Sequence, residues 1–185
     1  MIRLLQIKHW QLFILLIAIP IAMEIGAMVA IAISGDPLVM FRFFPLIMIV
    51  TMVIYFGWFY ALGTNLYQRL PASERMSVTI FKIFLFIPAL YIIILSIFIS
   101  NVMFNVLSSN TPPSPFLLLL ILPMHLFAMF CIFYCLYFIA KALKAVELQR
   151  PVTFSDFAGE FMLLWFFPIG VWIIQPRVNK LFEEV

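Results

Sequence analysis

Charged residues are scarce in this chain. Only 10% of its 185 residues are Asp, Glu, Lys or Arg, whereas 66% are hydrophobic. No charged residue lies between Arg42 and Arg69, or between Lys82 and Lys141. This composition excludes a soluble globule, because too few polar side chains are present to cover its surface. Most of the chain must therefore have lipid as its solvent.

The sequence also lacks the motifs that accompany most catalytic chemistry. It contains no glycine-rich phosphate loop, no HExxH helix, no paired aspartates for phosphoryl transfer and no serine elbow. We therefore expect a protein without enzymatic activity and without a cofactor. The net charge of +3 is explained by anchoring beside anionic lipid, so we expect no nucleic-acid partner.

Cysteine is nearly absent as well. Cys131 and Cys135 lie one turn apart on the same predicted helix, so they cannot build a disulfide framework. His125 lies about 120° away from Cys131 around that helix, which argues against a shared metal site. We expect no bound metal.

Long apolar segments are what the chain has instead. A helix crosses the hydrocarbon core with roughly 20 apolar residues, because unpaired backbone groups in lipid cost several kcal/mol each. Segments of this length lie near residues 10–34, 41–63, 79–104 and 116–140. The predicted fold class is an all-α integral membrane protein, with a four-helix transmembrane bundle in a single membrane domain over residues 1–185.

Basic residues fall almost entirely on one side of this arrangement. The N-terminus, the connection between the second and third spans, and the region after the fourth span carry nearly all of them. Arg42 alone lies on the other side. Since positively charged segments are retained in the cytoplasm, the sequence predicts a cytoplasmic N-terminus.

The apolar stretch after the fourth span is too short to cross the bilayer comfortably. It covers residues 161–174 and is interrupted by Pro168 and Gly170, which we interpret as a hinge. A crossing here would also export Arg177 and Lys180, against the charge asymmetry. A re-entrant or interfacial helical segment is the favoured interpretation, and a short fifth crossing is the alternative.

The boundaries of this C-terminal segment can be placed. Thr153 and Asp156 have the spacing of a capping box, which predicts a helix start there. The re-entrant or short fifth segment covers residues 157–175. Residues 176–185 have the pattern of an amphipathic helix lying among the lipid headgroups, so the C-terminus is expected to be cytoplasmic too.

Small residues form a ridge along the first span and allow another helix to approach closely. They recur at every fourth position, at Ala18, Ala22, Gly26, Ala30 and Ser34. Packing inside the bundle is the favoured explanation. Glu24 projects about 160° away from this ridge. An ionisable group in the membrane needs a partner or water, so the first span requires protein or water on two opposite sides.

His125 and Arg42 are the other polar residues of interest within the predicted spans. His125 lies at a depth similar to that of Glu24, so the two could form a pair that relays protons or holds a cation. A histidine bonded to a backbone carbonyl or a serine is the favoured alternative. Arg42 lies near the outer surface, where it can extend toward the headgroups or pair with Asp36.

Three stretches resemble a known family. They are SDFAGEFMLLWFFPIGVWIIQPRVNKLF, FFPLIMIV and the LP-x-H stretch from Leu122 to His125. The chain resembles a family of small polytopic bacterial inner-membrane proteins along most of its length. The resemblance implies the bacterial cytoplasmic membrane, but it brings no activity and no site residues.

Two functional hypotheses follow. The favoured one is a non-enzymatic subunit or accessory factor of a larger inner-membrane complex, or of a homo-oligomer, which docks through the first span and the amphipathic tail. The alternative is a small transporter or permease-like component that moves a solute or ion along a path lined by Glu24 and His125.

Overall fold

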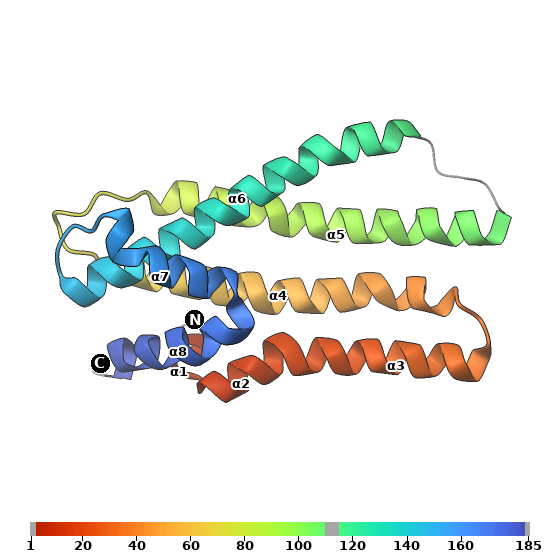
Figure 1. The fold of residues 1–185 in the computed structure, drawn as a ribbon, viewed down its shortest axis with the longest axis horizontal. Helices are drawn as coiled ribbons and strands as arrows, with labels where there is room; N and C mark the ends of the chain where they lie inside the picture. Colours follow the sequence, from red (N-terminus) through yellow and green to blue (C-terminus); the bar gives the residue numbers. More distant parts are fainter. Residues whose placement is uncertain (1–2, 110–114, 184–185) are drawn as a thin grey trace.

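The computed structural model describes residues 3–109 and 115–183, and this part of the chain is helical without strands. Four helices are long and apolar enough to cross a membrane: His9–Ser34, Val39–Tyr67, Val78–Ser108 and Leu119–Leu148. They lie side by side as a bundle (Figure 1). The predicted all-α integral membrane fold is therefore confirmed. The last three spans extend beyond their predicted C-terminal ends, because helices continue past the apolar limit into the interface.

The helices follow one another in a simple order (Figure 1). They are α1 (Arg3–Gln6), α2 (His9–Phe13), the π-helical turn η1 (Ile14–Ala18), α3 (Ile19–Ser34), α4 (Val39–Tyr67), α5 (Val78–Ser109), α6 (Pro115–Leu148), α7 (Phe154–Trp165) and α8 (Phe167–Glu183). The first span thus consists of α2, η1 and α3. The π-helical turn ends two residues before Pro20, which has no backbone N–H and crowds the preceding turn.

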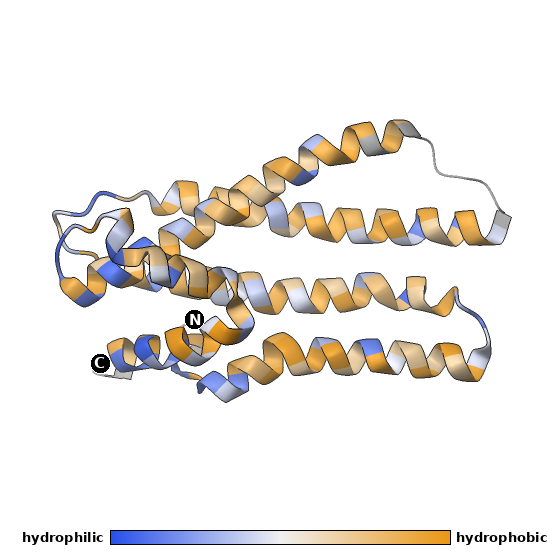
Figure 2. Ribbon diagram, in the orientation of Figure 1, coloured by the Kyte–Doolittle hydropathy of each residue, from blue (hydrophilic) through white to orange (hydrophobic). Residues whose placement is uncertain are grey.

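One end of the bundle collects both chain ends. The connections 68–77 and 149–153 lie there, together with the first and last described residues, and we refer to it as the termini end (Figure 1). Hydrophilic residues gather at this end, whereas the long helices are mostly hydrophobic (Figure 2).

The core lies in the half of the bundle nearer the termini end. Gly63 of α4 allows α5 to come close, since a Cβ there would lie 2.3 Å from atoms of the Phe81 ring. Phe81 is buried and stacks on Phe138 of α6, with 4.5 Å between ring centroids. Toward the opposite end, α6 diverges from α3 and α4 (Figure 1). Helix α6 is therefore joined to α4 and α5 near the termini end and diverges from α3 and α4 at the other.

Helices α7 and α8 form an antiparallel hairpin in which α7 packs on α6, and α8 packs on α1 and α2 (Figure 1). The N-terminus of α7 is capped as predicted: the Thr153 N–H and hydroxyl both donate to Asp156 Oδ2, at 2.8 and 2.9 Å. Arg150 adds an ion pair to Asp156 at 3.0 Å. These hydrogen bonds, led by the backbone N–H of Thr153, lower the pKa of Asp156 to about 2.

The break between α7 and α8 lies at Phe166, ahead of the expected hinge. Pro168 instead occupies the first turn of α8, where its missing N–H costs no helical hydrogen bond. Gly170 allows the two helices to meet, because a Cβ there would lie 1.8 Å from the Leu163 carbonyl oxygen. The expected hinge at Pro168 and Gly170 is therefore wrong: both residues lie within α8, and the chain turns at Phe166.

The expected amphipathic tail differs from the structure. Helix α8 continues through Pro176 to Glu183, so no separate tail begins at residue 176. Val178 is fully buried and Phe182 is almost so. The Arg69 guanidinium lies 4.0 Å from the centre of the Phe182 ring. The apolar face of this segment is thus packed against the chain itself, because α1 and the Arg69 side chain, just after α4, lie against α8.

Candidate functional site

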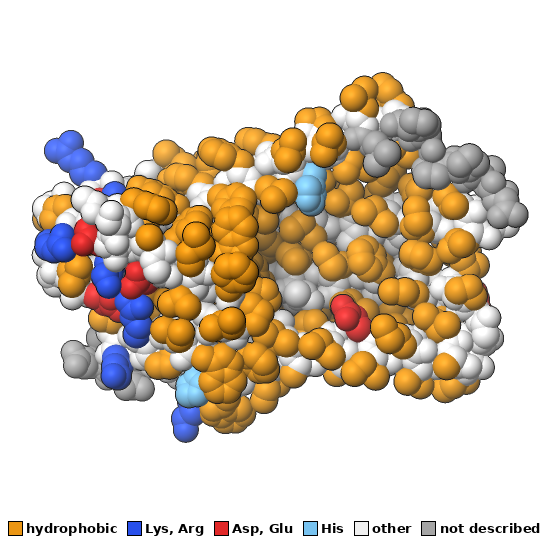
Figure 3. Space-filling model, in the orientation of Figure 1, with side chains coloured by type: hydrophobic (Ala, Val, Ile, Leu, Met, Phe, Trp, Pro, Cys, Tyr) orange, Lys and Arg blue, Asp and Glu red, His pale blue; other side chains and the backbone are white. Residues whose placement is uncertain are grey.

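Polar side chains of α8 meet those of α6 and α7 at the termini end. Figure 3 shows charged side chains concentrated there, on a surface that is otherwise largely hydrophobic. We call this cluster the α8 polar network. It consists of Lys144 and Glu147 of α6, Glu160 of α7, and Gln175, Arg177 and Asn179 of α8.

Arg177 joins three helices. Its Nε donates to Glu147 Oε1 at 2.8 Å and its Nη2 to Glu147 Oε2 at 2.5 Å, a bidentate pair between α8 and α6. The same Nη2 donates to Glu160 Oε1 of α7 at 2.7 Å. The planar guanidinium suits this double recognition in a way that a lysine cannot. The hydrogen bonds with Glu147 raise the pKa of Arg177 further above its ordinary value.

Glu160 is the most enclosed carboxylate of the network. Its side chain is only 8% exposed, and it also accepts a hydrogen bond from Lys144 Nζ at 3.2 Å. Burial raises the pKa of Glu160, but the hydrogen bonds from Arg177 and Lys144 lower it by more, so the net pKa lies below the ordinary value. Two fixed cations therefore keep this carboxylate ionised.

Gln175 attaches α8 to the start of the chain. Its Nε2 donates to the carbonyl oxygens of Leu5 and Ile7, at 3.1 and 3.0 Å. Its Oε1 accepts the indole N–H of Trp58 at 3.1 Å. Gln175 and Trp58 are both buried. The orphan carbonyls at the end of α1 are thereby satisfied by a side chain far away in the sequence.

Asn179 repeats this contact one turn later. Its Nδ2 donates to the carbonyl oxygens of Gln6 and Ile7, at 3.2 and 3.1 Å. Its Oδ1 is buried and has no hydrogen-bond partner among the described residues. Together with Gln175 it holds the N-terminal segment against α8.

A second set of polar contacts supports the connections of the termini end. Glu74, from the α4–α5 connection, pairs with Lys141 of α6 at 2.8 Å and accepts the Val152 N–H at 3.3 Å. Arg69 donates a hydrogen bond to the Leu181 carbonyl. These contacts and the α8 polar network fasten the hairpin, both chain ends and both connections to one another. We call this arrangement the clamp, and within it Glu74, Glu147 and Glu160 each pair with a basic residue.

Glu24 lies apart from this clamp. It is exposed and lines a small pocket of about 200 Å³ between α3 and α4, beside Ala27, Met28 and Met40. His125 is also exposed, on α6, with its Nδ1 3.5 Å from the Tyr91 hydroxyl of α5. Helix α3 and the far half of α6 lie on opposite sides of the bundle (Figure 1). The structure does not bring Glu24 and His125 together.

Arg42 and the two cysteines have ordinary surroundings. The Arg42 guanidinium lies 5.9 Å from the centre of the Phe104 ring, while the Asp36 carboxylate accepts the Leu38 N–H at 2.9 Å. Cys131 and Cys135 are buried. Within residues 3–109 and 115–183, no three His, Cys, Asp or Glu side chains are grouped as metal ligands.

The small-residue ridge is largely left open by its own chain. Ala22, Gly26 and Ser34 are exposed, while Ala18 and Ala30 are half-buried. Helix α3 instead buries Pro20 and Ala27. A Cβ at Gly26 would meet no atom within 4 Å. The middle of the ridge thus does no packing inside the bundle.

Sequence reasoning missed the α8 polar network. Gln175, Arg177 and Asn179 lie in the stretch IIQPRVNKLF. Arg177 was considered there only for its charge, and Gln175 and Asn179 were not predicted to make contacts. One sequence signal could have indicated it. Gln175 and Asn179 follow Ile174 and Val178 in a largely apolar segment, and amide side chains buried in such a segment need hydrogen-bond partners. Glu147 and Glu160 are also among only eight acidic residues.

We compared the chain with known proteins by sequence and by fold. No protein-family model, no curated protein and no solved structure matches it.

Proposed function

We propose that this protein is a non-enzymatic subunit or accessory factor of a larger membrane complex, and that it docks laterally through its first span. The observation that carries this proposal is the exposure of Ala22 and Gly26 in the middle of α3. Small residues on a membrane helix allow a second helix to approach the backbone closely, which favours association in lipid. No part of the described chain uses this surface.

Glu24 supports the same proposal from another side of α3. It is exposed within the first span, beside the small pocket between α3 and α4. An ionisable side chain within the hydrocarbon core costs at least about 3 kcal/mol unless it finds a partner, water or the interface. A neighbouring subunit that covers this part of α3 would provide such a partner.

The C-terminal segment 176–183 is not part of the proposed docking surface, although the sequence suggested that it would be. Val178 and Phe182 are packed against the chain, so the C-terminal helix no longer offers an apolar face. Docking is therefore assigned to α3 alone. The α8 polar network contributes indirectly by holding the N-terminal segment in place.

The membrane and the orientation are part of the proposal. The family resemblance supports the bacterial cytoplasmic membrane. The basic residues near both chain ends support a cytoplasmic termini end. In that orientation the α7–α8 hairpin enters the bilayer from the cytoplasmic side, turns at Phe166 and returns. The Phe166 N–H donates to the Met162 carbonyl and the Phe166 carbonyl accepts the Gly170 N–H, so the backbone of the turn is satisfied, as backbone in the membrane must be.

Cysteine labelling tests this topology. Single cysteines at Lys180 and Arg75 should react only from the cytoplasmic side, and one at Pro37 only from the periplasmic side. All three positions are in parts of the chain that end or connect helices, and all three side chains are exposed. If Lys180→Cys is labelled from the periplasmic side, α8 does not return to the cytoplasmic side and the proposed topology is wrong.

Association is tested by paired glycine substitutions. Gly26→Leu adds a bulky side chain to the ridge, whereas Gly57→Leu makes the same change in α4, and each glycine has open space where a Cβ would be. In mild detergent we expect the wild-type protein and Gly57→Leu to form an assembly larger than the monomer. Gly26→Leu should be monomeric. A wild-type protein that is monomeric and has no companion would contradict the proposal.

The transporter hypothesis has weaker support. A path lined by Glu24 and His125 within one chain is disfavoured by their placement on opposite sides of the bundle (Figure 1). Such a path would have to run between copies of the chain. Loss of proton-coupled uptake into vesicles in both Glu24→Gln and His125→Ala would favour this alternative.

A further inference from the structure

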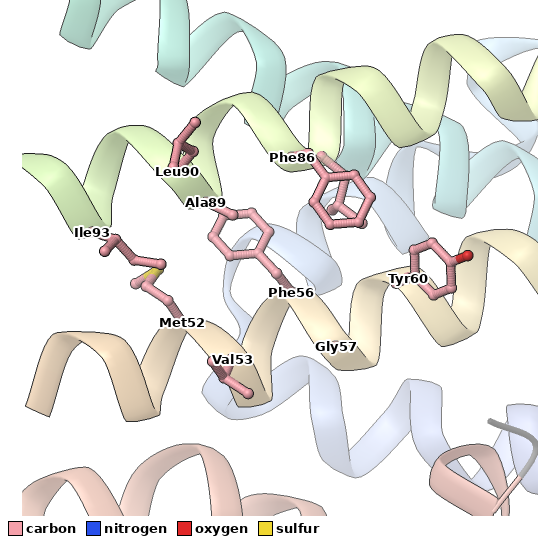
Figure 4. Close-up of a pocket in the computed structure, with 10 residues that line it drawn as sticks. Met52, Val53, Phe56, Gly57, Tyr60, Phe86, Ala89, Leu90 and Ile93 are labelled. Atoms are coloured by element: carbon pink, nitrogen blue, oxygen red, sulfur yellow. The ribbon is translucent and has the colours of Figure 1, made fainter. Parts of the chain in front are cut away.

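Helices α4 and α5 touch near both ends but separate in the middle. Near the termini end, Gly63 contacts Phe81. Near the other end, the Ser100 hydroxyl donates to the Phe41 carbonyl. Between these contacts lies a cleft of about 620 Å³, here called the α4–α5 cleft (Figure 4). Its lining includes Met52, Phe56 and Tyr60 of α4, and Leu85, Ala89 and Ile93 of α5.

The sequence explains why the cleft is there. Pro88 lies in the middle of α5 and has no backbone N–H, so one helical hydrogen bond is missing there. Gly57 and Ala89 face the cleft with little or no side chain, and a Cβ at Gly57 would meet nothing within 4 Å. Val53 and Phe86 at the rim are exposed, so the cleft opens sideways toward lipid. An apolar space of this kind needs an apolar occupant.

The dimensions of the cleft suit an acyl chain. From Met52 to Tyr60 the cleft follows α4 for about 12 Å. An extended hydrocarbon chain is only about one van der Waals contact, roughly 4 Å, across. A volume of 620 Å³ therefore accommodates an acyl chain between α4 and α5.

A basic residue lies where the headgroup of such a lipid would be. Lys82 precedes Phe86 by one turn on the same face of α5, and its Nζ is 5.8 Å from the centre of the Tyr60 ring. In Figure 4 the Tyr60 ring lies at the end of the cleft away from Met52 and Ile93. No ion pair of Lys82 is found within the described residues, in contrast to Lys141 and Lys144.

The depth of the cleft matches one leaflet. Lys82 and Ile93 are separated by about 16 Å along α5, roughly half of the 30 Å hydrocarbon core. With Lys82 among the headgroups, Ile93 lies near the bilayer centre. We propose that the α4–α5 cleft binds one anionic phospholipid from the leaflet at the termini end, with an acyl chain between α4 and α5 and its phosphate at Lys82.

Native mass spectrometry of the full chain in mild detergent tests this proposal, with phosphatidylglycerol and phosphatidylcholine as probes in equal amounts. The wild-type protein should retain one phospholipid and prefer phosphatidylglycerol about five-fold, as expected for one lysine near a membrane surface. Gly57→Leu should lose the retained lipid because its side chain fills the cleft. Gly26→Leu, the matched change on α3, should keep it. Lys82→Gln should keep the lipid and lose the headgroup preference.

Each other outcome overturns the proposal. Equal retention by the wild-type protein and Gly57→Leu would show that lipid does not lie in the cleft. If the wild-type protein and Lys82→Gln prefer phosphatidylglycerol equally, Lys82 does not bind the phosphate. If Gly57→Leu does not fold, the headgroup competition on the wild-type protein and Lys82→Gln decides. The proposal is independent of lateral docking, because Gly26→Leu should abolish assembly yet retain the lipid.

Discussion

Replacing Arg177 with glutamine should destabilise the protein by about 3 kcal/mol. Removing one partner of a buried ion pair costs about 3–5 kcal/mol, whereas an exposed pair contributes roughly 0.2–1 kcal/mol. The Arg177 side chain is 28% exposed, but its partner Glu160 is only 8% exposed. In Arg177→Gln that carboxylate keeps Lys144 alone, so we place the loss at the lower edge of the buried range.

The same reasoning predicts a coupling between the two residues. Glu160→Gln in the Arg177→Gln background should recover about 1 kcal/mol or more, because it removes the buried carboxylate that lost one of its two cationic partners. Lys180→Gln is the matched control: it neutralises a basic residue on the same helix, but Lys180 is exposed. We expect its effect to stay within about 0.5 kcal/mol.

Reversible unfolding in mixed micelles, with increasing sodium dodecyl sulfate and circular dichroism as the signal, measures these differences. The relevant quantity is the free energy of unfolding extrapolated to zero sodium dodecyl sulfate. Both changes remove one positive charge. If they lower the free energy of unfolding equally, the contacts of Arg177 with Glu147 and Glu160 do not stabilise the protein as we infer. A double variant less stable than Arg177→Gln alone would refute the assigned pairing.

Three further predictions follow from the packing. Gly170→Ala should prevent the hairpin from closing and lower the melting temperature sharply, whereas Gly159→Ala, with open space around it, should leave it unchanged or slightly raised. Gln175→Leu should destabilise by about 2 kcal/mol or more and alter the fluorescence of Trp58, whose indole N–H loses its acceptor. The pKa of Glu160 is lowered on folding, so its stabilisation is present above the ordinary pKa of about 4.3 and is lost as the pH falls through the lower folded value. Acidification to about pH 3 should therefore reduce the melting temperature less in Glu160→Gln than in the wild-type protein, and equal reductions would contradict this assignment.

The sequence by itself determined the membrane class and the number of spans. Each span is recognised locally, because lipid requires about 20 consecutive apolar residues whatever the rest of the chain does. The capping box of Thr153 and Asp156 was equally local and equally readable. Glu24 and His125 stood out for the same reason, as polar residues within apolar runs.

Tertiary structure alone decided which polar residues meet. Gln175 contacts Leu5 and Ile7 across nearly the whole chain, and no periodicity or motif specifies that distance in sequence. The turn at Phe166 was misplaced because Pro168 suggested a local bend, whereas the close contact of Gly170 with Leu163 determines how the hairpin closes. A local sequence pattern indicates whether a segment lies in lipid or in water. Contacts between residues far apart in the chain depend on how the helices pack, which no local pattern specifies.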